Sequence, residues 1–171
     1  KDLILPNACF HTEIKDPGRP TMAGSDAVEF LISMNKGEDL TPLAKTASGG
    51  ELSRLMLGLK AEFSRLQGIE TVIFDEIDTG VSGSVADKMG TVICAMGQHM
   101  QVFAITHLPQ VAAKGHAHYV VTKTVDGTAS KAVSTISRLS DAERVTEVAR
   151  MLSGSVLPDA AIANAKELLN S

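Results

Sequence analysis

The chain has 171 residues, of which 44% are hydrophobic and 21% charged, so it can form one ordinary globular domain with a sizeable core. This composition excludes a disordered chain, a collagen-like repeat and a disulfide scaffold. The net charge of −4 argues against a basic domain that binds nucleic acid through charge alone. The two cysteines, Cys9 and Cys94, favour free thiols in a reducing cytoplasm. No segment approaches the roughly 20 apolar residues that span a bilayer.

The first third of the chain predicts β structure followed by one helix. Residues 1–35 predict strands at 8–14 and 28–32, the second because apolar and polar residues alternate there. A loop is expected over 35–47. A helix is expected over about 51–66, because large apolar residues recur on one helical face before Gly68.

The central segment predicts a strand, a helix and a second strand. The apolar run at 71–74 is typical of a strand buried on both faces of a parallel sheet, and 102–105 is a second such run. A helix over about 84–96 joins them, and a right-handed crossover between parallel strands is the default for this order. The residues after the two runs should then meet at the carboxyl ends of neighbouring strands, where α/β sheets bind ligands.

The last third predicts smaller elements. They are a short helix from Pro109, a hairpin of strands 119–123 and 132–138 around Asp126–Gly127, a helix capped by Ser140 and Glu143 that ends near 152, and a final helix over 158–169. His116 and His118 would share one face of a strand, but no third metal ligand is apparent nearby.

A glycine-containing motif, Ser48 to Leu52, precedes the first predicted helix. Ser48 and Glu51 have the spacing of a capping box, which is a purely structural interpretation. Gly49 and Gly50 would also let an anion approach the free N–H groups of the helix start. Both interpretations can hold together.

Charged and polar residues follow both central strands. Asp75 and Glu76 end the first, and Thr106 and His107 end the second. Solvated acids and a structural histidine are the simpler interpretation. In a nucleotide-hydrolysing site Asp75 would hold magnesium, Glu76 would polarise the attacking water, and His107 would contact the terminal phosphate. The phosphate-binding motif G-x-x-x-x-G-K-[ST] does not occur, so the chain has the later half of an ATPase site without the earlier half.

The three motifs, in this order, resemble the signature motif, Walker B strand and switch histidine of an ABC-type ATPase head. The longer stretches 46–57, 74–83 and 105–112 are similar to the RecN family of bacterial double-strand-break repair proteins, which are relatives of the SMC proteins. The stretches 26–33 and 145–154 also resemble this family. The resemblance therefore extends from about residue 24 to residue 154.

The resemblance implies a role for each matching residue. Asp75 would help to hold Mg²⁺, Glu76 would be the catalytic carboxylate, and His107 would sense the γ-phosphate. ATP bound to a second head would contact the signature motif, Ser48, Gly49, Gly50 and Glu51. A cross-dimer loop would contain Asp78, Thr79, Gly80 and Ser82. The general pattern has Asp where this chain has Ser82, so that part of the cross-dimer role is open.

The implied fold is α/β: residues 1–171 would form the carboxyl-terminal lobe of an ABC/SMC-type P-loop ATPase head, with a mainly parallel sheet flanked by helices and an added hairpin. The amino-terminal lobe and the coiled coil would be missing, so the chain alone would not hydrolyse ATP. The implied partners are a second head, the chain's own amino-terminal lobe, and DNA, which the full-length protein would contact. ATP and Mg²⁺ would be held between the two heads. The resemblance implies no membrane partner. The implied location is the cytoplasm, at the nucleoid.

Two alternatives remain open. The chain could belong to the head of another SMC or ABC ATPase, such as a transporter. It could also be a non-catalytic interaction module that binds a partner through the helix end at Ser48.

Overall fold

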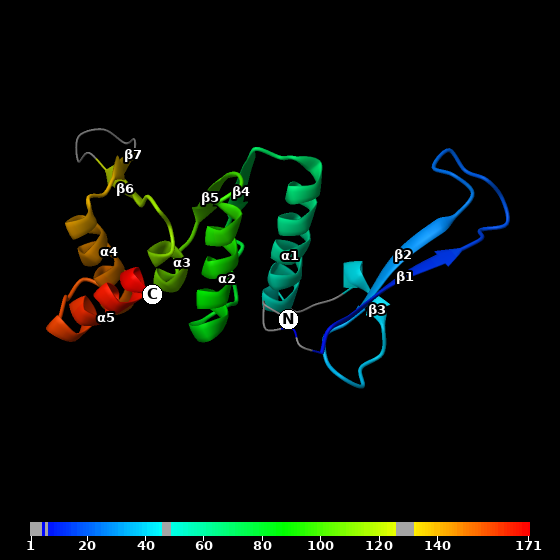
Figure 1. Ribbon diagram of the computed structural model, residues 1–171, viewed down its shortest axis with the longest axis horizontal. Helices are drawn as coiled ribbons and strands as arrows, with labels where there is room; N and C mark the ends of the chain where they lie inside the picture. Colours follow the sequence, from blue (N-terminus) through cyan, green and yellow to red (C-terminus); the bar gives the residue numbers. More distant parts are fainter. Residues whose placement is uncertain (1–4, 6, 46–48, 126–131) are drawn as a thin grey trace.

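The structure is a computed structural model that describes all residues of the chain except 1–4, 6, 46–48 and 126–131. The described elements follow one another along an elongated molecule (Figure 1). A small antiparallel sheet lies at one end, two helices and a parallel strand pair occupy the middle, and a helical pair lies at the other end.

The amino-terminal sheet contains β1 (Cys9–Lys15), β2 (Ala27–Ser33) and β3 (Thr41–Pro42). All neighbours are antiparallel, with β2 in the centre. This confirms the β structure predicted for the first 35 residues. The loop predicted over 35–47 is only partly right, because β3 pairs with β2 there and a 3-10 turn, η1 (Leu43–Lys45), follows it.

The central part has the predicted order of strand, helix and strand. Helix α1 (Gly49–Gln67) precedes β4 (Thr71–Asp75), and α2 (Gly83–Met96) connects β4 to β5 (Gln101–Ile105). The two strands are parallel and in register from the pair Thr71 and Gln101 to the pair Asp75 and Ile105. The parallel crossover unit is therefore confirmed.

The core of this central part lies on one face of the β4–β5 pair. Leu57 from α1, Phe74 from β4 and Met89 from α2 are buried together in one cluster. On the opposite face Ile73, Phe103 and Ile105 are 62%, 46% and 56% exposed. The prediction that these strands are buried on both faces is wrong for the described chain, because α1 and α2 both pack on the Phe74 side.

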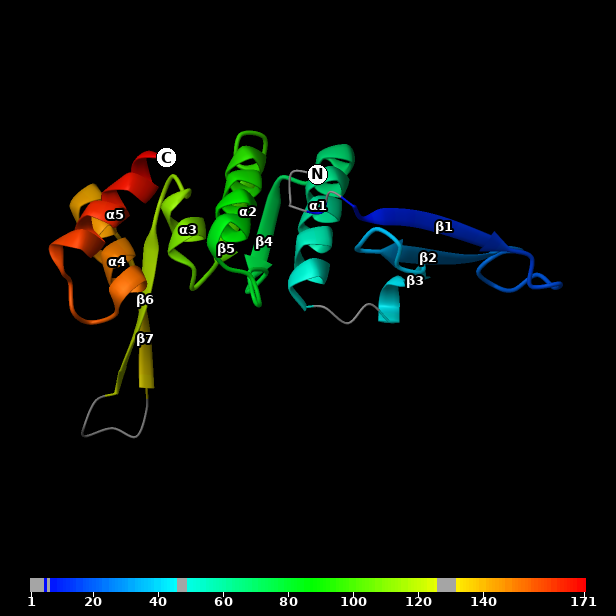
Figure 2. The same ribbon diagram turned by 90° about the horizontal axis from the view of Figure 1, so that it is seen from below.

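The carboxyl-terminal part begins with the short helix α3 (Pro109–Ala113). The antiparallel strands β6 (Tyr119–Val125) and β7 (Ala132–Arg138) form the predicted hairpin, which projects away from the helices in Figure 2. Its predicted turn at 126–127 lies outside the described residues. Helices α4 (Asp141–Ser153) and α5 (Asp159–Asn170) pack through a small core of Val148, Ala149, Ala161 and Ala165.

Two further sequence expectations can be compared with the structure. Cys9 and Cys94 are both free thiols. Within the described ranges, no helix has the length and apolar content needed to cross a membrane.

Candidate functional site

The carboxyl ends of β4 and β5 bring the two predicted strand-end motifs together. Asp75 lies opposite Ile105 in the parallel register, and the Glu76 amide donates a hydrogen bond to the Ile105 carbonyl at 3.2 Å. Asp75 and Glu76 therefore end one strand directly beside the point where Thr106 and His107 leave the other. We call this edge of the strand pair the carboxyl edge. The spatial arrangement predicted from the two strand-end motifs is present in the structure.

Glu76 holds an unusual backbone conformation at this edge. Its φ angle is 48°, and among the described residues it is the one non-glycine residue with a positive φ. A side chain in this region carries a local strain of order 1–3 kcal/mol, which persists where surrounding contacts impose it. Those contacts are visible here, because the amide and hydroxyl of Thr79 both donate to the Glu76 carbonyl, at 3.2 and 2.9 Å. The turn leaves the Glu76 side chain exposed to solvent.

The loop after β4 folds back against the end of β5 through Asp78. The Asp78 side chain is fully buried, and its Oδ2 accepts a hydrogen bond from the Thr106 hydroxyl. The Leu108 amide in turn donates to Thr106 Oγ1 at 2.9 Å. The other Asp78 oxygen, Oδ1, lies 3.8 Å from Nδ1 of His107, whose side chain is 67% exposed. The loop and the histidine segment are thus joined inside one chain.

The start of α1 packs on the same loop. A Cβ atom placed on Gly50 would lie 2.7 Å from the Gly80 carbonyl oxygen, so only glycine fits there without a shift. Gly80 itself has a φ of 75°, which favours glycine. A Cβ on Gly49 would meet no atom of the described residues within 4 Å. Gly50, in the predicted signature motif, therefore packs against the loop that leads from the acids to α2.

The remaining predicted residues have less defined surroundings. Ser48 lies outside the described residues, so its capping bond to Glu51 stays a prediction. Ser82 occupies the N-cap position of α2. Its side chain is exposed and makes no capping hydrogen bond with the described residues. Thr79 and Gly80 are also exposed.

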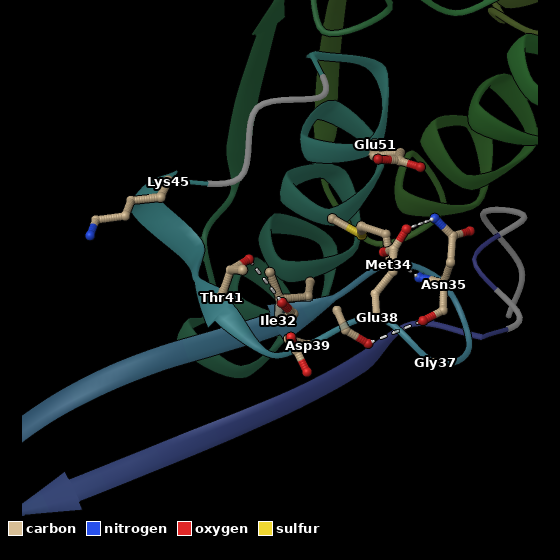
Figure 3. Close-up of a pocket in the computed structure, with 10 residues that line it drawn as sticks. Ile32, Met34, Asn35, Gly37, Glu38, Asp39, Thr41, Lys45 and Glu51 are labelled. Atoms are coloured by element: carbon tan, nitrogen blue, oxygen red, sulfur yellow. Dashed lines mark hydrogen bonds between the residues drawn. The ribbon is translucent and has the colours of Figure 1, made fainter.

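A hollow of about 470 Å³ lies apart from the carboxyl edge, between the amino-terminal sheet and the start of α1 (Figure 3). Its lining includes the carboxylates of Glu38, Asp39 and Glu51. Glu38 accepts hydrogen bonds from the amide and side chain of Asn35, at 3.1 and 2.8 Å. Glu51 is the one predicted site residue in this lining. Sequence reasoning missed the hollow because it treated most of the lining residues as a loop.

His118, which lies outside the carboxyl edge, has a shifted pKa. Burial lowers the pKa of His118 below its ordinary value, and the nearby Arg144 guanidinium lowers this pKa further, while Glu147 opposes the shift. His118 is half-buried, whereas His116, two residues earlier, is exposed. In the part of the chain that the structure describes, no cluster of three or more His, Cys, Asp or Glu could hold a metal ion.

The chain is similar over nearly its whole length to proteins named DNA repair protein RecN. It is 42% identical to that of Haemophilus influenzae over 99% of the chain, and 47% identical to that of Halalkalibacterium halodurans over 94% of the chain. The Bacillus subtilis relative is 42% identical over 99% of the chain. This sequence belongs to the RecN family. It spans only 28–32% of the length of these three relatives, as a carboxyl-terminal part.

Solved structures place the RecN-like chain in the fold of SMC ATPase heads. The Smc head domain of Pyrococcus yayanosii has a TM-score of 0.67 at 18% identity, covering 86% of this chain and 26% of that one. A chain from a study of ATP-driven dimerization and DNA-stimulated activation of SMC ATPases has a TM-score of 0.58 at 18% identity, covering 85% and 83%. No protein-family model matches the chain. The α/β fold class expected from the sequence is confirmed, and within this chain its parallel portion is the β4–β5 pair.

Proposed function

We propose that residues 1–171 form the carboxyl-terminal lobe of the ATPase head of a RecN protein. The whole protein then uses ATP hydrolysis between paired heads in the repair of DNA double-strand breaks. The proposal is supported by the 40–47% identity to RecN proteins and by the similarity to SMC heads. The observation that carries it is the carboxyl edge, where the parallel register puts Asp75 and Glu76 beside the histidine segment.

Asp75 is the residue that would hold Mg²⁺. Its carboxylate is exposed at the end of β4, and no three-residue metal cluster occurs among the described side chains. A single carboxylate such as that of Asp75 fits Mg²⁺, which commonly binds one or two carboxylates together with water and substrate phosphates. When bound, the ion neutralises charge on the phosphate oxygens.

Glu76 and His107 would act on the attacking water and the γ-phosphate. Glu76 is the exposed carboxylate next to Asp75, and its constrained backbone fixes the direction in which the side chain leaves the strand. We assign it the task of orienting and polarising the water. His107 presents an exposed imidazole at the same edge, which suits contact with the terminal phosphate.

A second head would complete the site. The signature motif, including Ser48, Gly49, Gly50 and Glu51, would contact ATP on the other head, and the loop from Asp78 to Ser82 would link the two sites. SMC ATPases of this fold have been studied for ATP-driven dimerization and DNA-stimulated activation, which is the behaviour we propose for the full-length protein. The amino-terminal lobe would supply the phosphate-binding loop that the sequence lacks. The protein would work in the cytoplasm, at the nucleoid.

The first prediction concerns Glu76→Gln in the full-length protein. We expect magnesium-dependent ATP hydrolysis to fall by about 10²–10⁴-fold, because the amide cannot accept a proton from water. ATP-dependent association of the heads should persist and become longer-lived. Steady-state hydrolysis and analytical ultracentrifugation with and without ATP measure the two effects.

The matched control is Glu70→Gln, the same change on an exposed residue just before β4, at the opposite end of that strand from Glu76. It should leave hydrolysis within about twofold of the parent rate, as expected for a surface substitution away from special features. Equal hydrolysis by the Glu76 variant and the parent protein would contradict the proposed catalytic role. Full-length protein that neither hydrolyses nor binds ATP would favour the non-catalytic interaction module.

A further inference from the structure

We propose that Asp78 is a positioning residue for His107. Its buried carboxylate turns the imidazole so that Nδ1–H faces into the chain and Nε2 faces the carboxyl edge. The inference assigns Asp78 a task within its own chain, in addition to any role of its loop across a head pair. Its consequence for hydrolysis rests on the proposed function.

The Asp78 carboxylate is only partly paired by the residues that the structure describes. The side chain is fully buried, and of its two oxygens Oδ2 has a described hydrogen-bond donor, the Thr106 hydroxyl. Oδ1 has no hydrogen-bond partner among the described residues. Buried polar atoms are almost always paired, and an unpaired carboxylate oxygen is especially unfavourable. The structure therefore leaves Oδ1 in need of a donor.

The His107 imidazole is placed to supply this donor. Nδ1 of His107 lies 3.8 Å from Oδ1, just beyond hydrogen-bond length. His107 is largely exposed, so its ring can rotate toward Asp78 without displacing packed side chains. A small rotation completes the pair. Nδ1 must then carry the proton, and Nε2 is left facing outward as the atom available to a ligand.

Hydrogen bonds from two loops hold the Asp78 carboxylate in place. Thr106 donates to Asp78 and also accepts from the Leu108 amide at 2.9 Å. Leu108 is the N-cap residue of α3, and Pro109, the first residue of that helix, is buried. Asp78 is fixed from its own side by the turn in which the Val81 amide donates to the Asp78 carbonyl at 3.1 Å. The carboxylate is thus held between two loops and cannot follow the imidazole outward.

The direct test is the tautomer of His107 in the 171-residue chain. Long-range ¹H–¹⁵N NMR spectra at alkaline pH, with His107 assigned through His107→Gln, should show Nδ1–H as the main form. In Asp78→Asn the amide oxygen stays on the Thr106 hydroxyl, so the NH₂ group faces Nδ1. The main form should then switch to Nε2–H, because Nδ1 must accept that bond. The exposed His11 and His99 serve as internal controls and should not change.

An unchanged His107 tautomer in Asp78→Asn would overturn the inference, and so would an Nε2–H form in the parent chain. A switch confined to His107 supports it. This measurement needs no ATP, so it decides the role of Asp78 even if the full-length protein does not hydrolyse ATP. Failure of the proposed function and failure of this inference are therefore distinguishable.

A kinetic cycle in the full-length protein tests the consequence for hydrolysis. Asp78→Asn should lower kcat by about tenfold or more while the KM for ATP stays within about twofold, as expected when a supporting residue misorients a catalytic group. With His107→Ala already present, the same change should lower kcat by less than about twofold, because the residue that it positions is absent. An equal loss in both backgrounds would show that Asp78 acts through the fold in general, and would overturn the inference.

Discussion

The contact between Gly50 and Gly80 gives a prediction at the scale of single residues. Gly50→Ala would force a methyl group to within 2.7 Å of the Gly80 carbonyl oxygen, and backbone on both sides limits the relief. We expect a loss of about 1–3 kcal/mol in the free energy of unfolding, the range of overpacking substitutions. Urea denaturation of the 171-residue chain measures it.

The neighbouring Gly49→Ala is the matched control. It adds the same methyl group at the start of the same helix, where no atom in the described part of the chain lies within 4 Å of the new atom. Its stability should equal or slightly exceed that of the parent, because alanine is a better helix residue than glycine. Two variants of equal stability would contradict the packing argument.

At the scale of elements, the capping box of α4 gives the clearest prediction. The Glu143 amide donates to Ser140 Oγ, and the Ser140 amide and hydroxyl donate to the Glu143 carboxylate. Ser140→Ala should lower the free energy of unfolding by about 1 kcal/mol near neutral pH. Ser155→Ala, an exposed serine just after α4, should have almost no effect.

The effect of Ser140→Ala should also depend on pH. The hydrogen bonds from Ser140 lower the pKa of Glu143 below its ordinary value of 4.5. A carboxyl group with a lowered folded-state pKa stabilises the fold above the unfolded-state pKa, and this contribution is lost as pH falls through the folded-state pKa. The difference between parent and variant should therefore shrink below about pH 4.5. A difference that grows on acidification would contradict this account.

The elements were predictable where their signals are local. The apolar faces of α1 and α2, the two apolar strands and the capping box all depend on residues close in sequence. The strand β3 was missed because Thr41 and Pro42 carry no strand pattern, and only pairing with β2 makes them one. The hollow was missed because its lining combines the loop between β2 and β3 with residues of β2, β3, η1 and α1, and only the fold brings these segments together.

The candidate site was predictable in part. Parallel pairing was enough to place Asp75, Glu76 and His107 at one edge. The inward turn of Asp78 was not predictable, because three acids lie among residues 75–78, at the end of β4 and just after it, and their sequence does not say which one is buried. The exposed face of β4 and β5 was not predicted, because apolar residues such as Ile73 and Phe103 indicate burial but do not identify the element that covers them.

At the scale of the whole molecule, that open face predicts how the proposed head is assembled. Ile73, Phe103 and Ile105 form an apolar strip on the uncovered side of the parallel pair. We expect the proposed amino-terminal lobe, added as a separate protein, to cover this strip and to restore magnesium-dependent ATP hydrolysis. Ile73→Asp should prevent the restoration without unfolding the chain, because the residue is already 62% exposed.

Val121→Asp is the control for this prediction. Val121 is an equally exposed apolar residue on the hairpin strand β6, away from the open face. The lobe should restore hydrolysis to this variant as it does to the parent. Full restoration with Ile73→Asp, or none with the parent chain, would contradict the assembly that we propose.

The carboxyl edge depends on pairing between segments that are distant along the chain. Each residue of β4 faces one in β5 that is 30 positions later, as Thr71 faces Gln101. Parallel pairing over such a separation is slow, because the entropy of closing the intervening segment is lost before the strand contacts form. We therefore expect the acids and the imidazole to come together only when β5 pairs with β4, in a comparatively slow step of folding.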